Sequence, residues 1–212
     1  MKKFEKIIGF VLLTGLIFKF LFIPGGSFFF AFSSLIMATF YFYLGFAFYN
    51  QIPFKRIFNK AAYSEINTAK IILSIGFGIG LSNICIGILY KIQHWTGARF
   101  LLITGITIIM IVLLIGLIRI DKTKGLFLTG IIKRSIIIGG FGVLLLLISD
   151  HSIIKIQYRN HPLYIKAYED FKSNPNNTGY KDNLIKERDR IYLPEEVFKQ
   201  KYNEEEENTV LN

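Results

Sequence analysis

The chain has 212 residues, of which 52% are hydrophobic and 16% aromatic. A soluble domain of this length cannot bury so much apolar surface, so the composition excludes an ordinary globular protein and indicates a membrane protein. Residues 1–149 hold fifteen lysines and arginines against three acidic residues, whereas residues 150–212 hold ten against twelve. The net charge of +10 therefore belongs to the flanks of apolar segments, which is typical of membrane proteins and does not indicate nucleic-acid binding.

The first 50 residues predict a transmembrane hairpin. A basic start is followed by the apolar run Ile7–Ile23, which only Lys19 interrupts, and no small-x-small cleavage site indicates a removed signal peptide. Residues 24–27 have the proline and glycines of a turn, and Phe28–Tyr49 is long enough to cross about 30 Å of hydrocarbon. We expect residues 1–50 to form hairpin one.

The next two apolar runs predict a second hairpin. Residues 51–70 are polar and basic and are expected to form a cytoplasmic loop. The run Ile71–Tyr90 contains several glycines and serines, which allow transmembrane helices to approach closely. A turn over Lys91–Arg99 leads into Phe100–Ile118, so residues 71–118 are expected to form hairpin two.

Residues 119–157 predict a basic loop and a fifth transmembrane helix. The apolar run 135–149 is short for a crossing unless it includes the isoleucines at 131–132 or continues to Ile154. Residues 127–134 could instead lie along the membrane interface. The fold class that we expect is all-α, a polytopic transmembrane bundle of two repeated hairpins, a fifth helix and a small helical C-terminal tail.

Charge asymmetry predicts the orientation. Twelve lysines and arginines flank the spans on one side and three on the other, which places the N-terminus in the cytoplasm and both hairpin turns outside. With five crossings, the tail of residues 158–212 lies outside as well. Proline at 162, a turn over 174–179 and Leu193-Pro194 predict three helices in this soluble tail.

The two hairpins resemble each other in sequence. A shift of 72 residues aligns four residues of hairpin one with identical residues of hairpin two, and both hairpins enter the membrane from the same side, so this would be a parallel repeat. The aligned pairs are Gly15 with Gly87, Lys19 with Lys91, Gly25 with Gly97, and Phe28 with Phe100.

Hairpin two contains the pattern Gly-x-x-x-Lys-x-x-His-Trp-x-Gly, formed by Gly87, Lys91, His94, Trp95 and Gly97. This pattern resembles the N-terminal transmembrane hairpin of the GldL family, which supplies the membrane stator of the gliding and type IX secretion motor in the Bacteroidota. The resemblance covers roughly forty residues of hairpin two and implies an inner-membrane protein related to gliding motility.

Several positions depart from the family pattern. Thr96 stands where the family has proline, and hairpin one has Phe22 and Ile23 where histidine and tryptophan would be. The family's second helix carries a membrane glutamate that handles protons, but the equivalent positions here are Ile109 and Met37, and the predicted first four spans contain no acidic residue. The resemblance therefore implies a relative that is not a proton-driven motor.

Six residues near the hairpin turns are candidates for function or for anchoring at the interface. If the third helix continues through Lys91 and His94, the two share a face and would bind an anion, a lipid headgroup or a carboxylate of a partner. The alternative is that Lys91 extends to the interface and Trp95 anchors there. The candidates are Lys91, His94, Trp95, Gly97, Lys19 and Gly25.

The sequence offers little chemistry for catalysis. Asp150, His151 and His161 lack metal-ligand spacing, and Cys85 lies in an apolar run as a small hydrophobic residue. We expect no catalytic, cofactor-binding or metal-binding residues, no cofactor and no enzyme activity. The favoured function is a non-catalytic structural or accessory subunit that binds the bilayer and a protein partner or further copies of itself. The alternatives are a small transporter or channel with Lys91 and His94 at an outer entrance, and a lipid-modifying membrane enzyme.

Overall fold

The computed structural model of the chain describes residues 1–64, 66–119 and 126–210, and of residues 126 and 203–210 it describes the backbone alone. Within these residues the regular structure is entirely helical, which confirms the predicted all-α bundle. The contacts divide the chain into two compact units. The division does not coincide with the predicted hairpins, because the turn of hairpin one belongs to the second unit. Unit 1 comprises residues 1–19 and 25–150, and unit 2 comprises residues 20–24 and 151–212.

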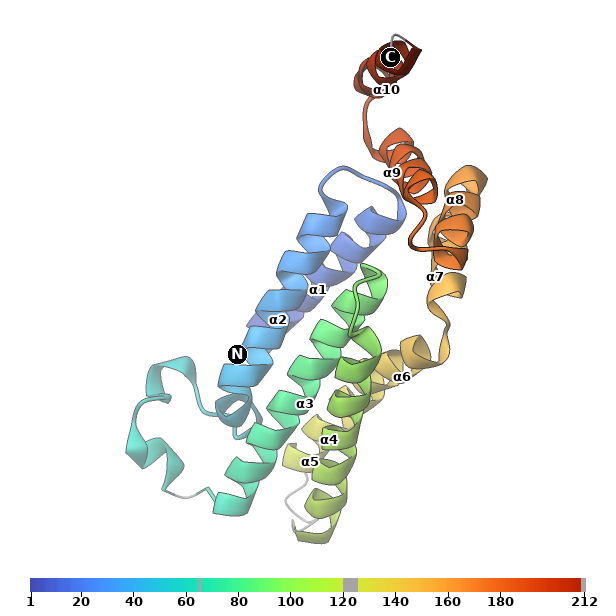
Figure 1. Cartoon of the computed structure of the whole chain (residues 1–212). Helices are drawn as coiled ribbons and strands as arrows, with labels where there is room; N and C mark the ends of the chain where they lie inside the picture. The colour runs from blue at the N-terminus through green and yellow to red at the C-terminus, as the bar shows by residue number, and fades with distance from the viewer. Residues whose placement is uncertain (65, 120–125, 211–212) are drawn as a thin grey trace. The chain divides into compact units, whose positions relative to one another are not determined.

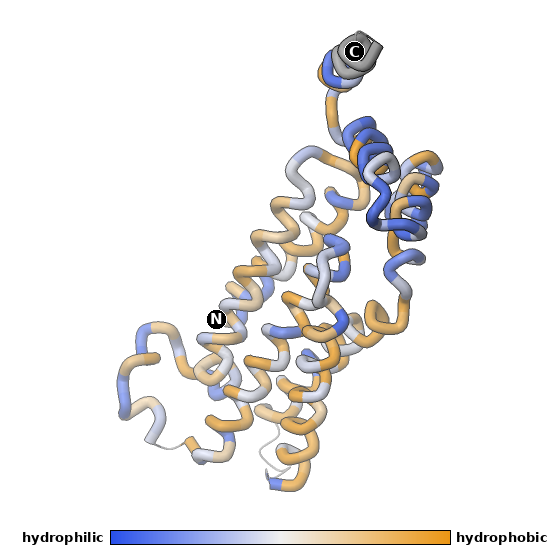
Figure 2. The backbone as a smooth tube through the Cα atoms, in the orientation of Figure 1, coloured by the Kyte–Doolittle hydropathy of each residue, from blue (hydrophilic) through white to orange (hydrophobic). Residues whose placement is uncertain are grey.

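Unit 1 contains the long apolar helices. Figure 1 shows α2, α3 and α4 running side by side with α6 oblique to them, and Figure 2 shows that hydrophobic residues predominate along these helices. The bounds are α1 Lys2–Phe20, α2 Gly26–Tyr49, the 3-10 helices η1 Phe54–Arg56 and η2 Lys60–Tyr63, α3 Thr68–Ile92, α4 Ala98–Arg119, α5 Leu126–Arg134, the π-helical turn η4 Ser135–Gly139, and α6 Gly140–Leu147.

Four helical segments in the described part of the chain are long and apolar enough to cross a membrane by length and composition. They fit an integral membrane protein. The segments are Gly26–Tyr49, Thr68–Ile92, Ala98–Arg119 and Phe127–Leu147.

The last of these segments, Phe127–Leu147, corresponds to the predicted fifth crossing and is called the fifth segment below. It is longer than the apolar run 135–149 from which that crossing was predicted. Residues 127–134 do not form a separate segment, because α5, η4 and α6 follow one another without a break up to Leu147. The basic pair Lys133 and Arg134 therefore lies within the helical segment, one residue before the π-helical turn. Such turns are rare, and they occur frequently at functional sites.

Small residues set the spacing of the helices in unit 1. A Cβ atom at Gly45 of α2 would lie 3.0 Å from the Cα atom of Gly78 in α3, and one at Gly105 of α4 would lie 2.8 Å from the carbonyl oxygen of Gly80 in α3. Dispersion contacts between closely spaced helices replace the hydrophobic effect, which lipid does not provide. The central helix α3 is thus held against α2 on one side and α4 on the other.

The two hairpin turns have the same backbone geometry at a separation of 72 residues. α1 ends at Phe20 and α3 at Ile92, while α2 begins at Gly26 and α4 at Ala98. Phe22 and His94 have φ angles of 56° and 59°, and the turn glycines have φ angles of 83° and 92°, in the left-handed region that favours glycine. The sequence repeat is therefore matched by a repeat in the backbone.

The helices of each hairpin also approach each other at equivalent positions. A Cβ atom at Gly15 would lie 2.7 Å from the backbone nitrogen of Phe30, and one at Gly87 would lie 3.0 Å from the backbone nitrogen of Leu102. Gly87 and Leu102 lie 72 positions after Gly15 and Phe30, respectively. A side chain at either glycine would force the two helices of that hairpin apart.

Unit 2 is a small helical unit with tyrosines at its centre. The ring of Phe22 lies 5.3 Å from that of Tyr158 and 4.9 Å from that of His161, and the hydroxyls of Tyr158 and Tyr192 are 3.1 Å apart. Hydrophilic residues predominate along α8 and α9 (Figure 2). The helices are α7 Asp150–Gln157, α8 Pro162–Ser173, α9 Thr178–Tyr192 and α10 Glu195–Val210.

Candidate functional site

A cluster of charged and hydroxyl groups lies inside unit 1. The guanidinium of Arg134 in α5 donates two hydrogen bonds to the carboxylate of Glu5 in α1, each 2.5 Å long, and forms a bidentate ion pair with it. The hydroxyl of Tyr41 in α2 donates a hydrogen bond of 2.8 Å to the same carboxylate. Three helices that are distant in sequence therefore meet at one carboxylate.

Further contacts hold the guanidinium in place. Its Nη1 atom donates a 3.0 Å hydrogen bond to the carbonyl of Gly130, and its central carbon lies 4.6 Å from the ring centroid of Phe48. The side chains of Glu5 and Arg134 are 15% and 20% exposed. A charge this far removed from water is costly unless it is paired, so each group here requires the other.

The cluster lies well inside the bundle. Tyr41 is eight residues before the end of α2 at Tyr49, which at 1.5 Å per residue is about 12 Å. Ionisable residues at such depth in apolar helices are expensive, and they mark functional or organising sites. This cluster is the first candidate site.

Sequence reasoning missed this cluster. We expected the first span to begin at Ile7, which left Glu5 in the basic start, and we assigned Arg134 to the cytoplasmic loop. α1 begins at Lys2, so Glu5 occupies the first turn of α1, ahead of the apolar run. The four apolar segments that are long enough to cross a membrane contain no acidic residue. One signal was available, since Glu5 is the only acidic residue among the first 64.

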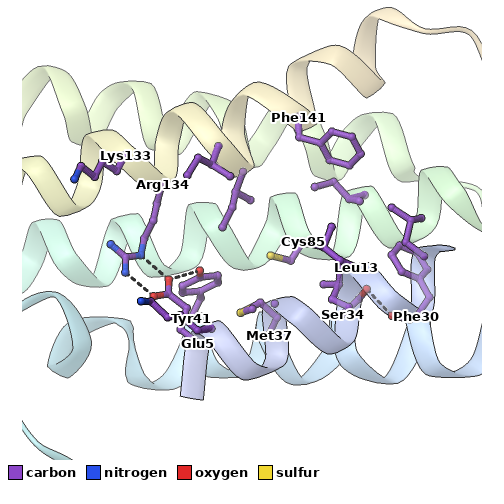
Figure 3. A pocket seen from close by; sticks show the side chains of 17 residues that line it. Glu5, Leu13, Phe30, Ser34, Met37, Tyr41, Cys85, Lys133, Arg134 and Phe141 are labelled. Carbon is purple, nitrogen blue, oxygen red and sulfur yellow. Dashed lines mark hydrogen bonds and ion pairs between the residues drawn. The ribbon is translucent and has the colours of Figure 1, made fainter. Parts of the chain in front are cut away.

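A cavity of about 690 Å³ adjoins the cluster. α2 and α3 contribute residues such as Met37 and Cys85, α1 contributes Gly9 and Leu13, and the η4–α6 segment contributes Phe141. Figure 3 shows the charged side chains gathered toward one end, away from Phe141 and Leu13. The cavity is therefore apolar along most of its length and charged at one end.

The predicted lysines are buried at the other ends of α1 and α3. Lys19 is 5% exposed, and its Nζ atom donates a 2.6 Å hydrogen bond to Oε1 of Gln93, whose Nε2 atom donates to the carbonyl of Ser27 at 3.1 Å. Lys91 is 8% exposed and pairs with Asp150 at 2.6 Å. Both lysines thus stabilise contacts between segments, and neither lines the cavity.

The remaining predicted residues lie in the two hairpin turns. α3 ends at Ile92 and His94 has a positive φ, so Lys91 and His94 do not share a helix face as we expected. Trp95 is half exposed, with its ring 5.2 Å from that of Tyr90. Gly25 and Gly97 supply the left-handed residues of their turns. The sequence pattern thus describes a turn, with Lys91 in the last turn of α3 and His94 two residues beyond the end of that helix.

The histidines and Asp150 do not form a common cluster. Asp150 pairs with Lys91, the Nε2 atom of His151 is 3.3 Å from a carboxylate oxygen of Glu169, and His161 packs against Phe22. In the part of the chain that the structure describes, no three histidine, cysteine or acidic residues come together as metal ligands would.

The fold and the cluster define an all-helical integral membrane protein with an ion-paired cluster inside its apolar bundle. No protein-family model matches this chain, and neither a curated protein nor a solved structure is significantly similar to it.

Proposed function

We propose that the chain is a non-catalytic structural or accessory subunit of a complex in the bacterial inner membrane. The observation that carries this proposal is that the buried lysines and the Glu5 carboxylate are bound by other side chains of the same chain. Lys19 is bound to Gln93, Lys91 to Asp150, and Glu5 to both Arg134 and Tyr41. These bonds organise the bundle.

A transport pathway through the second turn has less support. Charged residues at an entrance must be available to the solute. Lys91 is instead almost fully buried in an ion pair, and neither Lys91 nor His94 lines the cavity. A role for Lys91 in holding α3 against the end of the fifth segment accounts for its position better than a role at an entrance.

The resemblance of hairpin two to the GldL hairpin supports a subunit role in a related complex. The position of that family's proton-handling glutamate corresponds to Ile109 in hairpin two and to Met37 in hairpin one, which are 4% and 5% exposed. Neither side chain can bind a proton. We therefore propose a diverged relative that does not drive a motor with protons at these positions.

We further propose five crossings, with the N-terminus in the cytoplasm and the tail in the periplasm. Two ion pairs support this topology. The start of α1 is joined to Arg134, the eighth of the 21 residues of the fifth segment, and the end of α3 is joined to Asp150, just beyond the C-terminal end of that segment. Phe127–Leu147 has 21 residues, which corresponds to about 32 Å of helix.

The test is isolation of the tagged full-length chain from native membranes in a mild detergent, followed by crosslinking and mass spectrometry. We expect a second protein at a constant ratio to the chain, whichever terminus carries the tag. An unrelated polytopic protein with the same tag, expressed at the same level, controls for adventitious capture.

Two results would contradict the proposal. The first is a chain that is isolated alone or only with copies of itself. The second is solute flux in proteoliposomes of the purified chain that is lost in Lys91→Met, because this would identify a transport protein that needs no partner.

A further inference from the structure

The cavity of unit 1 is open on one side, between α1 and the π-helical turn. Leu13 and Ile137 line it from these two segments, and they are 58% and 70% exposed. The helices around this opening are apolar, so the phase that meets it in a membrane is lipid. Protein interiors contain few voids larger than a water molecule, whereas about 690 Å³ is the size of a ligand pocket.

The charged end of the cavity has an excess of positive charge. Its lining includes the cations Lys6, Lys133 and Arg134 and a single acidic residue, Glu5, which Arg134 already binds in a bidentate ion pair. The two lysines therefore add positive charge next to a neutralised pair. Figure 3 shows Lys133 and Arg134 at this end, on the side opposite Phe141.

An apolar cavity with cations at one end matches an anionic amphiphile. Basic pockets between transmembrane helices bind anionic lipid headgroups. Lys6 is the fifth residue of α1, and Lys133 is the seventh of the 21 residues of Phe127–Leu147. Both side chains are exposed, and a lysine side chain can extend from within a transmembrane helix toward a headgroup.

We propose that the cavity binds one anionic phospholipid of the surrounding bilayer, with an acyl chain between α1 and the η4–α6 segment and its phosphate at Lys6 and Lys133. The Glu5–Arg134 pair closes the cavity below the headgroup and keeps α1 and α5 at a fixed distance. This inference does not depend on the subunit role proposed above.

The first test uses the unaltered chain in nanodiscs. A phosphatidylglycerol with a diazirine in the middle of one acyl chain is photolysed, and the crosslinked residues are mapped by mass spectrometry. Met37 and Cys85 line the cavity but are only 5% and 6% exposed, so a chain that stays on the outer surface does not reach them. We expect crosslinks at these residues. Crosslinks confined to outward residues such as Phe100 and Met110, which are 72% and 62% exposed, would overturn the proposal.

The second test compares headgroups. Native mass spectrometry measures the affinity for phosphatidylglycerol relative to phosphatidylcholine with the same acyl chains. Two lysines near the membrane surface correspond to a preference of roughly 30-fold, which Lys6→Gln with Lys133→Gln should abolish. The matched control is Lys55→Gln with Lys60→Gln, which removes the same charge from residues outside the cavity lining. Equal affinity for the two lipids in the unaltered chain would overturn the assignment of the headgroup.

The third test fills the cavity. A Cβ atom at Gly9 would meet only the terminal methyl of Met37, at 3.7 Å, so Gly9→Leu can extend into the cavity without striking backbone. We expect a loss of binding of both lipids by tenfold or more. Gly140→Leu is the control, because Gly140 is helical, has open space at its Cβ position and does not line the cavity. Unchanged lipid binding by Gly9→Leu would contradict the proposed place of the acyl chain.

Discussion

A carboxylate and a guanidinium can lie deep in an apolar bundle only because each offsets the desolvation cost of the other. Glu5 and Arg134 satisfy this condition through two hydrogen bonds, and Tyr41 supplies a third. Breaking a buried pair by removing one partner is strongly destabilising, because the remaining charge is uncompensated. Removing both partners leaves no unpaired charge.

We therefore predict that Glu5→Gln and Arg134→Gln each lower the free energy of unfolding by about 3 kcal/mol. The double variant should lose about 2 kcal/mol less than the sum of the two. Titration with dodecyl sulfate in mixed micelles measures these values. Arg99→Gln, at an exposed arginine, is the control and should change stability by less than about 0.5 kcal/mol. Strictly additive losses would show that the two residues do not depend on each other.

At the scale of helices, the sequence predicted the two hairpins well and the outer helices less well. The turns carry strong local signals, because Gly25 and Gly97 are required for left-handed backbone, and both turns form where they were expected. The start of α1 and the first part of the fifth segment are instead joined by a long-range ion pair, which hydropathy does not report. Local hydropathy alone therefore assigned Glu5 and Arg134 to flanking segments.

The close contacts between helices at Gly15 and at Gly87 predict how substitution of each glycine changes the free energy of unfolding. Gly15→Ala should lower the free energy of unfolding by about 2 kcal/mol or more, because the new methyl group meets the backbone of Phe30. Gly87→Ala should cost less, since two of its three nearest atoms belong to the movable side chain of Leu102. Gly140→Ala, with open space around it, should stabilise by about 0.5 to 1 kcal/mol through helix propensity. The same denaturant titration ranks the three variants, and equal effects of all three would refute the close approaches.

The contact between α9 and α10 should depend on pH. Burial raises the pKa of the Asp189 carboxyl, but hydrogen bonds from Lys201, Arg188 and Tyr202 outweigh burial and hold that pKa below its ordinary value. The folded contact thus binds fewer protons than the unfolded one. Its stabilisation is complete above the ordinary aspartate pKa of about 4 and is lost as the pH falls through the lowered value.

Spin labels at Lys181 and Gln200, on a Cys85→Ala background, measure this effect as a distance between α9 and α10. We expect a narrow distribution at pH 6 that broadens as the pH falls below about 4. Asp189→Asn should be broad at both pH values. Glu195→Gln removes an exposed carboxylate that pairs only within α10, with Lys199, and should leave the pH dependence intact. A distribution that stays narrow in acid would contradict the role assigned to Asp189.

At the scale of the whole molecule, the sequence predicted a membrane protein and an all-helical bundle, but it did not predict the candidate site. Composition and hydropathy can be determined for each segment separately, and they are sufficient to predict the fold class. The cavity is lined by α1, α2, α3 and the η4–α6 segment, so it exists only in the packed bundle. Lys91 and His94 do not share a helix face, because α3 ends between them at Ile92.

We propose a five-crossing bundle whose fifth segment is held by one ion pair at Arg134, within the segment, and by another at Asp150, just beyond its C-terminal end. Single cysteines at Phe58, Thr96 and Asn176, each on the Cys85→Ala background, test it directly with an impermeant maleimide applied to intact cells and to inverted membrane vesicles. All three positions are exposed. We predict labelling of Thr96→Cys and Asn176→Cys from the outside and of Phe58→Cys only in inverted vesicles. Labelling of Asn176→Cys from the same side as Phe58→Cys would contradict the fifth crossing.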